Sequence, residues 1–218
     1  MKKYIYILCL FTFISVNAQD DTTSDETTTD KLTFAKGSNL LNAGLFFNSS
    51  KIENNVGAEQ KQFLFGANTA YGYAINDNFF LGLGLGYVNR DAEFTDTLGS
   101  TQDLTSYSFN IFPYVRYYKG LGKHLAIFGQ GEVLFSNEKE ELNGIDTQKI
   151  NTFFVGIRPG LTYMLNKNFA LEITVGALGY TSRNIDDLSV ANSVDTDTSE
   201  FGLSLNFDDL IFGLSYYF

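Results

Sequence analysis

The sequence is poor in several residue types. Among 218 residues it has no tryptophan, two prolines, one cysteine and one histidine. Only 18% of the residues are charged, whereas soluble domains usually have about 25%. Two prolines and 20 glycines also exclude a collagen-like or low-complexity chain. The shortage of charge is the feature that a fold assignment has to explain.

The single cysteine and the single histidine limit the chemistry available to the chain. Cys9 lies in an apolar N-terminal stretch without a small residue before it, so we expect neither a lipoprotein cleavage site nor a thiol catalyst. His124 lies beside a predicted turn, in the stretch KGLGKH. Hydrolysis and acyl transfer need a base that works near neutral pH. We therefore expect no enzyme, no catalytic residue and no cofactor.

The N-terminus has the pattern of an exported protein. Lys2 and Lys3 precede an apolar stretch of residues 4–16, too short for a membrane helix, and Ala18 suits a cleavage site. We predict a cleaved signal peptide at residues 1–18. Its removal leaves 13 Lys and Arg against 25 Asp and Glu, a net charge of −12, which disfavours binding to nucleic acid. Residues 19–36 are acidic and rich in threonine, and we expect a flexible leader there.

From residue 37 to residue 218 the chain repeats stretches in which apolar and smaller residues alternate. This period of two is typical of β-strands, and no stretch shows a helical stripe. The expected strands are residues 38–49, 61–75, 79–92, 104–118, 124–137, 149–165, 169–183 and 200–218. The pattern predicts one all-β domain of eight antiparallel strands.

The connections between these strands are of two kinds that alternate along the chain. The tight turns are residues 76–78, 119–123 and 166–168, and the long, mostly acidic connections are residues 50–60, 93–103, 138–148 and 184–199. Short turns at one end and long loops at the other are typical of a transmembrane β-barrel. We therefore expect an up-and-down barrel with periplasmic turns, both termini periplasmic, and four long acidic extracellular loops.

The composition of the two strand faces separates a membrane barrel from a soluble, lipocalin-like one. A water-facing surface would be roughly a quarter to a third charged. In residues 149–165 one face is apolar and the other holds mainly glycine, threonine and one arginine: Phe153, Val155, Ile157 and Leu161 against Gly156, Arg158, Gly160 and Thr162. Small residues suit the narrow inside of an eight-stranded barrel and large apolar residues suit lipid. We predict a membrane barrel.

Four charged residues in mid-strand fall on the inward face, namely Arg116, Glu132, Arg158 and Glu172. Their charges cancel, and Glu132 and Arg158 lie on neighbouring strands at similar distances from a turn. Because unpaired charges are costly inside a narrow lumen, we expect a hydrogen-bonded structural network that plugs the barrel. A proton or ion path is the alternative. Pro113 and Pro159 conflict with a closed sheet unless bulges accommodate them.

Three segments carry a family resemblance: IFPYVRYYKGLGKHLAIFGQGE (111–132), GIRPGLTYMLNKNFALEITVGALGY (156–180) and LSYYF (214–218). They resemble the small outer-membrane β-barrel domain proteins of Gram-negative bacteria, with the architecture of OmpA/OmpX-type barrels. The resemblance implies an outer-membrane location and contact with outer-membrane lipid. It also implies that Leu214, Tyr216 and Phe218 form the signal recognised by the barrel-assembly machinery.

These features predict a monomeric barrel with a structural or surface-interaction role and a plugged, non-conducting lumen. Membrane integrity, adhesion, or contact of the acidic loops with surface polysaccharide or a host ligand would fit. A lipid-modifying enzyme or a narrow small-solute channel is the alternative. Asp195, Asp197 and Glu200 have spaced carboxylates but lack the glycine and the full spacing of a calcium loop, so we expect no metal site.

Overall fold

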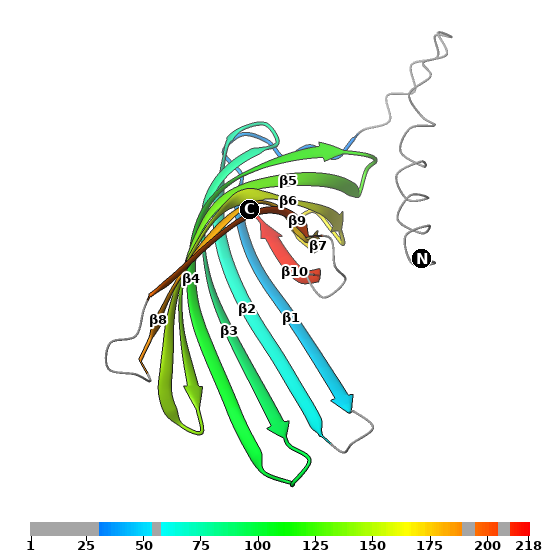
Figure 1. Ribbon diagram of the computed structural model, residues 1–218. Coiled ribbons are helices and arrows are strands. Elements are labelled where there is room, and N and C mark those ends of the chain that lie inside the picture. Colours follow the sequence, from blue (N-terminus) through cyan, green and yellow to red (C-terminus); the bar gives the residue numbers. More distant parts are fainter. Residues whose placement is uncertain (1–30, 54–57, 189–194, 205–209) are drawn as a thin grey trace, which may run out of the picture.

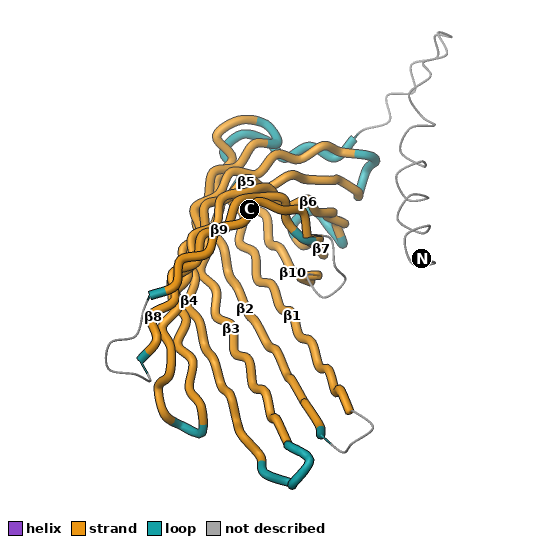
Figure 2. The backbone as a smooth tube through the Cα atoms, viewed as in Figure 1, coloured by secondary structure: helices purple, strands orange, loops and turns teal. Residues whose placement is uncertain are grey.

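The structure is a computed structural model that describes residues 31–53, 58–188, 195–204 and 210–218. The predicted signal peptide and residues 19–30 of the predicted leader lie outside these ranges. Every regular element in the described part of the chain is a β-strand (Figure 2). No helix within it is long and apolar enough to cross a membrane.

Ten strands make up one antiparallel sheet (Figure 1). They are β1 (Asn39–Glu53), β2 (Glu59–Asn76), β3 (Phe79–Thr95), β4 (Thr101–Gly120), β5 (Leu125–Leu142), β6 (Ile145–Met164), β7 (Phe169–Val175), β8 (Ala177–Asp187), β9 (Thr196–Ser204) and β10 (Leu210–Tyr217).

Hydrogen-bonded pairing closes the sheet into a ring. Strands β1 to β7 pair in chain order, and β10 pairs with both β7 and β1. The closing ladder runs from Leu40 opposite Tyr217 to Leu45 opposite Phe212. The predicted all-β antiparallel barrel is therefore confirmed. We call the end where β1 begins and β10 ends the terminal end, and the opposite end the far end.

The structure has ten strands where the sequence pattern predicted eight. The stretch predicted at residues 169–183 is divided into β7 and β8 by Gly176, which has a φ of 56°. The stretch predicted at residues 200–218 appears as β9 and β10, and residues 205–209 between them lie outside the described ranges. β8 pairs with β6 beyond the β6–β7 ladder, and β9 pairs with β8.

A β-bulge lies opposite Pro159. Gly160 of β6 pairs with Thr174 of β7, and Ile157 of β6 pairs with Leu178 of β8. The two pairs are three residues apart on β6 but four residues apart along β7 and β8. The extra residue falls at Gly176, where the ladder is already broken, so the missing N–H of Pro159 costs no regular hydrogen bond on that side. At Pro113 the β4–β5 ladder is interrupted between Ile111 and Tyr114, without an extra residue.

The prediction of four long loops at the far end is wrong in the described residues. Strands continue into the polar segments, and the connections shorten to residues 96–100 and 143–144 in two of the four cases. Asn143 and Gly144 have φ values of 51° and 78°, as a two-residue hairpin turn requires. Ion pairs across β1 and β2, such as Lys51 with Glu59 at 3.2 Å, accompany the extended ladder. The acidic segments therefore belong to protruding hairpins.

Large apolar side chains cover the outside of the ring. Leu83, Leu171 and Phe212 are each about half exposed, at 49%, 50% and 56%. On β4, Tyr117 and Phe109 also point outward and are 57% and 63% exposed. The nine residues from Phe109 to Tyr117 match the length of a membrane-spanning β-strand. A continuous apolar belt of this kind suits contact with lipid rather than water.

The end of the predicted flexible leader is ordered against the terminal end. Within residues 31–37, which we call the strap, Leu32 donates a backbone hydrogen bond of 2.8 Å to Gly122, in the β4–β5 turn. Phe34 donates to Oδ1 of Asn78 at 2.8 Å and accepts from the Asn78 backbone N–H, also at 2.8 Å. The Phe34 side chain is only 5% exposed. These contacts join the strap to the barrel and place the Phe34 ring in a buried site.

Candidate functional site

Aromatic rings fill the lumen at the terminal end. Phe34 stacks on Tyr217 with ring centroids 4.4 Å apart and contacts Tyr118 at 4.5 Å. Phe80 lies edge-on to Tyr118 at 5.5 Å. These four side chains are at most 5% exposed, and Leu40 beside them is fully buried. The terminal end of the lumen is thus a packed apolar layer.

Arg116 lies next to this layer, on the side toward the far end. Its guanidinium donates to Oε1 of Gln130 from Nε at 2.9 Å and from Nη2 at 2.6 Å. Nη1 donates to the hydroxyl of Tyr118 and to Oε2 of Glu172, both at 2.8 Å. The guanidinium also lies over the ring of Phe128, 4.3 Å from its centroid. A charge that is 4% exposed is therefore paired and satisfied.

Glu172 gathers donors from four strands other than its own. Its Oε1 accepts hydrogen bonds from the hydroxyls of Tyr217 at 2.9 Å, Tyr118 at 3.2 Å and Thr162 at 3.2 Å. Its Oε2 accepts from Arg116 and, at 3.1 Å, from the amide of Asn42. Both carboxylate oxygens are saturated, which is what a buried anion requires.

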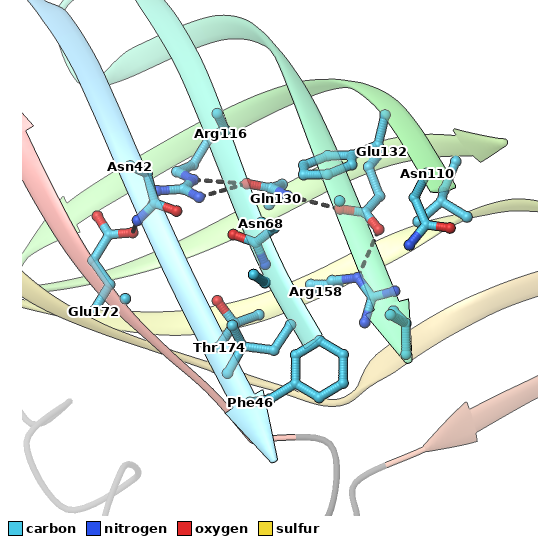
Figure 3. Close-up of a pocket in the computed structure, with 18 of the residues that line it drawn as sticks. Asn42, Phe46, Asn68, Asn110, Arg116, Gln130, Glu132, Arg158, Glu172 and Thr174 are labelled. Carbon is cyan, nitrogen blue, oxygen red and sulfur yellow. Dashed lines mark hydrogen bonds and ion pairs between the residues drawn. The ribbon is translucent and has the colours of Figure 1, made fainter. Parts of the chain in front are cut away.

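The chain of hydrogen bonds continues to a second ion pair. Nε2 of Gln130 donates to Oε2 of Glu132 at 2.7 Å, and Nε of Arg158 donates to Oε1 of Glu132 at 2.6 Å (Figure 3). Gln130 stands directly between Arg116 and Arg158 in the β4–β5–β6 register. Together Glu172, Arg116, Gln130, Glu132 and Arg158 form what we call the lumen network, which carries no net charge.

Glycines make room for the rings and amides of the lumen. Phe112 lies over Gly84, its register partner on β3, where a Cβ atom would come within 2.2 Å of the ring. Phe128 lies over Gly160 in the same way, at 2.1 Å. A larger side chain at either glycine would displace the ring. The glycines of the inward face are therefore the counterparts of specific large neighbours on the next strand.

A cavity of about 290 Å³ adjoins the lumen network toward the far end. Its floor includes Arg116, Gln130, Glu132 and Arg158. Its wall is largely apolar and includes Phe46, Leu64, Val88, Phe112, Leu134 and Ile211.

The four charged residues singled out from the sequence all lie inside the barrel, in two ion pairs joined by Gln130. Sequence reasoning missed the contribution of Tyr118 and Tyr217 to the network. The period of two does place both on the inward face, but their meeting across the lumen depends on ring closure. Tyr217 belongs to the closing strand, two positions after the buried Ser215.

The three residues of the predicted assembly signal lie on the outward face of β10. Leu214 and Phe218 are 48% and 56% exposed. Tyr216 contacts the ring of Phe169 at 4.8 Å and stacks on Phe218 at 5.3 Å. Leu214, Tyr216 and Phe218 therefore lie along the apolar belt.

His124 and the carboxylates that the sequence suggested as calcium ligands lie outside the lumen. His124 is exposed beside the β4–β5 turn, with its ring 6.3 Å from that of Tyr163. Asp197 accepts a hydrogen bond from the amide of Asn184 at 2.9 Å. Within these ranges no group of three or more His, Cys, Asp or Glu side chains is placed to hold a metal ion.

Comparison with solved structures finds small outer-membrane barrels. Outer membrane protein OprG from Pseudomonas aeruginosa is 16% identical, with 84% of this chain and 97% of that chain covered and a TM-score of 0.48. Neisserial surface protein A is 16% identical, with 85% and 99% covered and a TM-score of 0.45. The N-terminal β-barrel domain of Pseudomonas aeruginosa OprF is 15% identical, with 85% and 100% covered and a TM-score of 0.35.

No curated protein sequence matches the chain. The sequence does match a family described as the outer membrane protein beta-barrel domain, over residues 6–207. This match spans most of the chain and agrees with the closed antiparallel ring, the apolar belt and the packed lumen. The protein therefore belongs to the outer membrane protein beta-barrel domain family.

Proposed function

We propose that the protein is a non-conducting, monomeric outer-membrane barrel that supports membrane integrity and presents charged hairpins to the outside of the cell. In this proposal a signal peptide at residues 1–18 directs export, and both termini face the periplasm. The observation that carries the proposal is the packing of the lumen. Phe34, Tyr118 and Tyr217 fill the terminal end, and the hydrogen-bonded lumen network lies directly behind them.

Conductance tests the non-conducting state directly. The purified barrel, inserted into planar lipid bilayers, should give no stable and reproducible conductance steps, because rings and ion pairs obstruct the narrow lumen. An open porin inserted under the same conditions provides the positive control. Reproducible single-channel steps from the wild-type barrel would contradict the proposal and favour the alternative of a narrow small-solute channel.

The structural role of the lumen network is tested by removing one carboxylate. Glu132→Ala leaves Arg158 and Gln130 without their acceptor, so we expect a loss of about 3 kcal/mol in the free energy of unfolding. Urea unfolding in lipid vesicles measures this loss. Glu138→Ala is the matched control, because the contact of Glu138 with Arg90 is longer, at 3.9 Å. Equal stability of the Glu132→Ala variant and the wild type would show that the network is not structural.

Location and assembly are tested in cells. Membrane fractionation should place the protein in the outer membrane, with different gel migration before and after boiling, as expected for a folded barrel. Phe218→Ala should lower the amount assembled if Leu214, Tyr216 and Phe218 are read by the barrel-assembly machinery. Phe47→Ala, at an outward-facing position near the middle of β1, is the control. A protein found soluble in the periplasm would refute the proposed location.

The surface role rests on the hairpins of the far end. Lys51, Glu59, Lys61 and Glu93 form ion pairs there, beyond the length that a strand needs to cross a membrane. Surface polysaccharide or a host ligand would be the partner. Cells that carry the wild-type barrel should bind such a partner better than cells with shortened β1–β2 and β3–β4 hairpins. Equal binding would leave membrane integrity as the function.

A further inference from the structure

The cavity beside the lumen network has two chemically different sides (Figure 3). Its floor carries the second ion pair, Glu132 with Arg158, and its wall is apolar. At about 290 Å³ its volume lies near the lower end of the range for small-molecule sites. A ligand for this cavity would have one polar end and one apolar end.

Each carboxylate oxygen of the floor already accepts at least one hydrogen bond. Both oxygens of Glu132 accept hydrogen bonds, from Arg158 and Gln130. Both oxygens of Glu172 accept as well, from donors that include Tyr217 and Asn42. A cationic ligand would also meet the positive charge of Arg158, which lines the same cavity. The floor is therefore unsuited to a ligand that offers only donors.

Donors, in contrast, remain available. Within the described part of the chain, the Arg158 side chain donates one hydrogen bond, from Nε to Glu132. Its Nη1 and Nη2 atoms point away from that carboxylate (Figure 3), and the side chain is 23% exposed. The guanidinium lies 5.2 Å from the ring centroid of Phe154, which supports its orientation. Arg158 thus presents a positively charged, planar pair of donor groups to the cavity.

Two amides line the same cavity as this guanidinium. Asn68 and Asn110 line the cavity, and a Cβ atom on Gly44 or Gly86 would meet their side chains at 2.7 and 3.3 Å. Glycine at these two positions leaves the amides room against the wall. Among the described residues, neither amide donates a hydrogen bond to another side chain. Both can donate to a bound acceptor.

The wall supplies a complementary apolar surface. Its side chains come from the inward faces of six strands: Phe46, Leu64, Val88, Phe112, Leu134 and Ile211. Apolar groups that line an inward face at this depth gain nothing from lipid contact, because lipid lies on the other side of the sheet. They would gain from covering the apolar part of a ligand.

We propose that this cavity binds a small amphipathic carboxylate, held by Arg158 at its charged end and by the apolar wall along its body. The planar guanidinium matches a carboxylate through two parallel hydrogen bonds. One available guanidinium in a network without net charge suits a monoanion better than a phosphate with two charges. Because the terminal end of the lumen is packed, the ligand enters and leaves from the far end.

Three probes of equal shape test the recognition of charge. 3-Phenylpropanoate, 3-phenylpropan-1-ol and 3-phenylpropylammonium differ only in the polar end. With the full-length mature barrel in zwitterionic nanodiscs, ligand-observed NMR should show at least tenfold tighter binding of the carboxylate than of the other two. Empty nanodiscs give the background from partition into lipid. Absence of carboxylate binding, or equal binding of the alcohol, would overturn the proposal.

Variants test which residues bind the charged end of the ligand and which bind its apolar body. Replacing Arg158 and Glu132 together by Gln keeps two side chains that can hydrogen-bond each other without charge, and should weaken carboxylate binding at least tenfold. Leu134→Gln should weaken binding of the carboxylate through the wall. Arg90→Gln, which removes an arginine that does not line the cavity, should leave binding unchanged.

Migration on gels with and without boiling verifies that each variant is folded. Unchanged binding in the folded double variant would exclude Arg158 as the anion site, and unchanged binding in folded Leu134→Gln would exclude the apolar wall. The binding test does not depend on conductance, so its failure is distinguishable from a failure of the proposed non-conducting role.

Discussion

At the scale of single residues, the inner wall works by pairing one glycine with one large side chain on the neighbouring strand. Phe112 over Gly84 and Phe128 over Gly160 are two examples, each between register partners. A ring that lies flat on the adjacent backbone occupies the lumen without protruding far into it. This arrangement lets the closed ring of strands hold aromatic rings, two ion pairs and a cavity together.

Substitution of these glycines should therefore be costly. Gly84→Ala places a methyl group within 2.2 Å of the Phe112 ring, and we expect a loss of about 1–3 kcal/mol in the free energy of unfolding. Gly129→Ala on β5 is the matched control, because nothing lies within 4 Å of its added Cβ. Urea unfolding in vesicles measures both. Equal losses would mean that backbone propensity, and not ring contact, selects glycine in these strands.

At the far end, ion pairs between the hairpin strands shift the pKa values of the charged side chains. The hydrogen bond from Lys61 lowers the pKa of Glu59 below its ordinary value of 4.5, and Lys51 acts in the same direction. The hydrogen bond to Glu59 in turn raises the pKa of Lys61 above 10.5. A lowered carboxyl pKa stabilises the folded hairpin above about pH 4.5, and a raised amine pKa stabilises it below about pH 10.5.

We predict that the Glu59 carboxyl titrates below pH 4.5 when followed by carbon-13 NMR. Its contribution to the hairpin should disappear as the pH falls through that midpoint. Lys61→Gln should move the midpoint upward, toward the ordinary value, because the strongest partner is lost. Lys139→Gln, which removes an ion pair with Asp146 on another hairpin, should leave it in place. A midpoint at or above 4.5 in the wild type would contradict the prediction.

At the scale of strands and turns, the period of two was sufficient to find the spanning segments and to assign their faces. A pleated strand puts successive side chains on opposite sides, so lipid on one side and a narrow lumen on the other leave a clear record in the sequence. Strand ends were harder to predict. Outside the membrane both faces are polar, and a polar strand has the composition of a loop.

The signals that distinguish a polar hairpin from a loop are local. One is the turn pair Asn143-Gly144, flanked by Leu142 and Ile145, which is a strong hairpin signal that the composition of the segment concealed. Another is the facing of opposite charges, such as Lys61 opposite Glu93 at 2.9 Å. The bulge at Gly176 could not be located from the sequence. Pro159 indicated only that the regular hydrogen bonding of the sheet had to be interrupted near it.

The two-residue turn between β5 and β6 requires a left-handed backbone at Gly144. Gly144→Ala forces an alanine into a left-handed conformation with φ near 78°, which should cost about 1 kcal/mol. The amides of Leu142 and Ile145 should then exchange with deuterium about fivefold faster, since opening the hairpin tip becomes easier by that amount. Gly129→Ala is the control, because an added Cβ there meets nothing within 4 Å and the φ of Gly129 is not left-handed. Equal exchange in both variants would argue against a strict two-residue turn.

At the scale of the whole molecule, closure of the ring brings together residues that the sequence keeps far apart. The pairing of Glu132 with Arg158 follows from neighbouring strands and similar distances from a turn. The meeting of Tyr118 with Tyr217 does not, since it joins the fourth strand to the last one across the lumen. Phe34 was missed because a lone aromatic residue in a polar segment has no periodicity to reveal it.

The strap should contribute to the stability of the entire barrel. Phe34→Ala removes a ring from the packed layer at the terminal end, and we expect a loss of about 3 kcal/mol in the free energy of unfolding. Phe47→Ala is the matched control, because Phe47 is 77% exposed on the outward face, where lipid can take the place of its ring. Similar losses in urea unfolding would mean that the strap is seated only loosely.

The position of Phe34 also has a consequence for the order of events in time. Its site is made of Phe80 on β3, Tyr118 on β4 and Tyr217 on β10, so it is incomplete until the last strand has joined the first. The strap is synthesised before every strand of the barrel, yet it can be seated only after all of them. Burial of Phe34, which precedes β1, therefore reports that β10 has paired with β1 and closed the barrel.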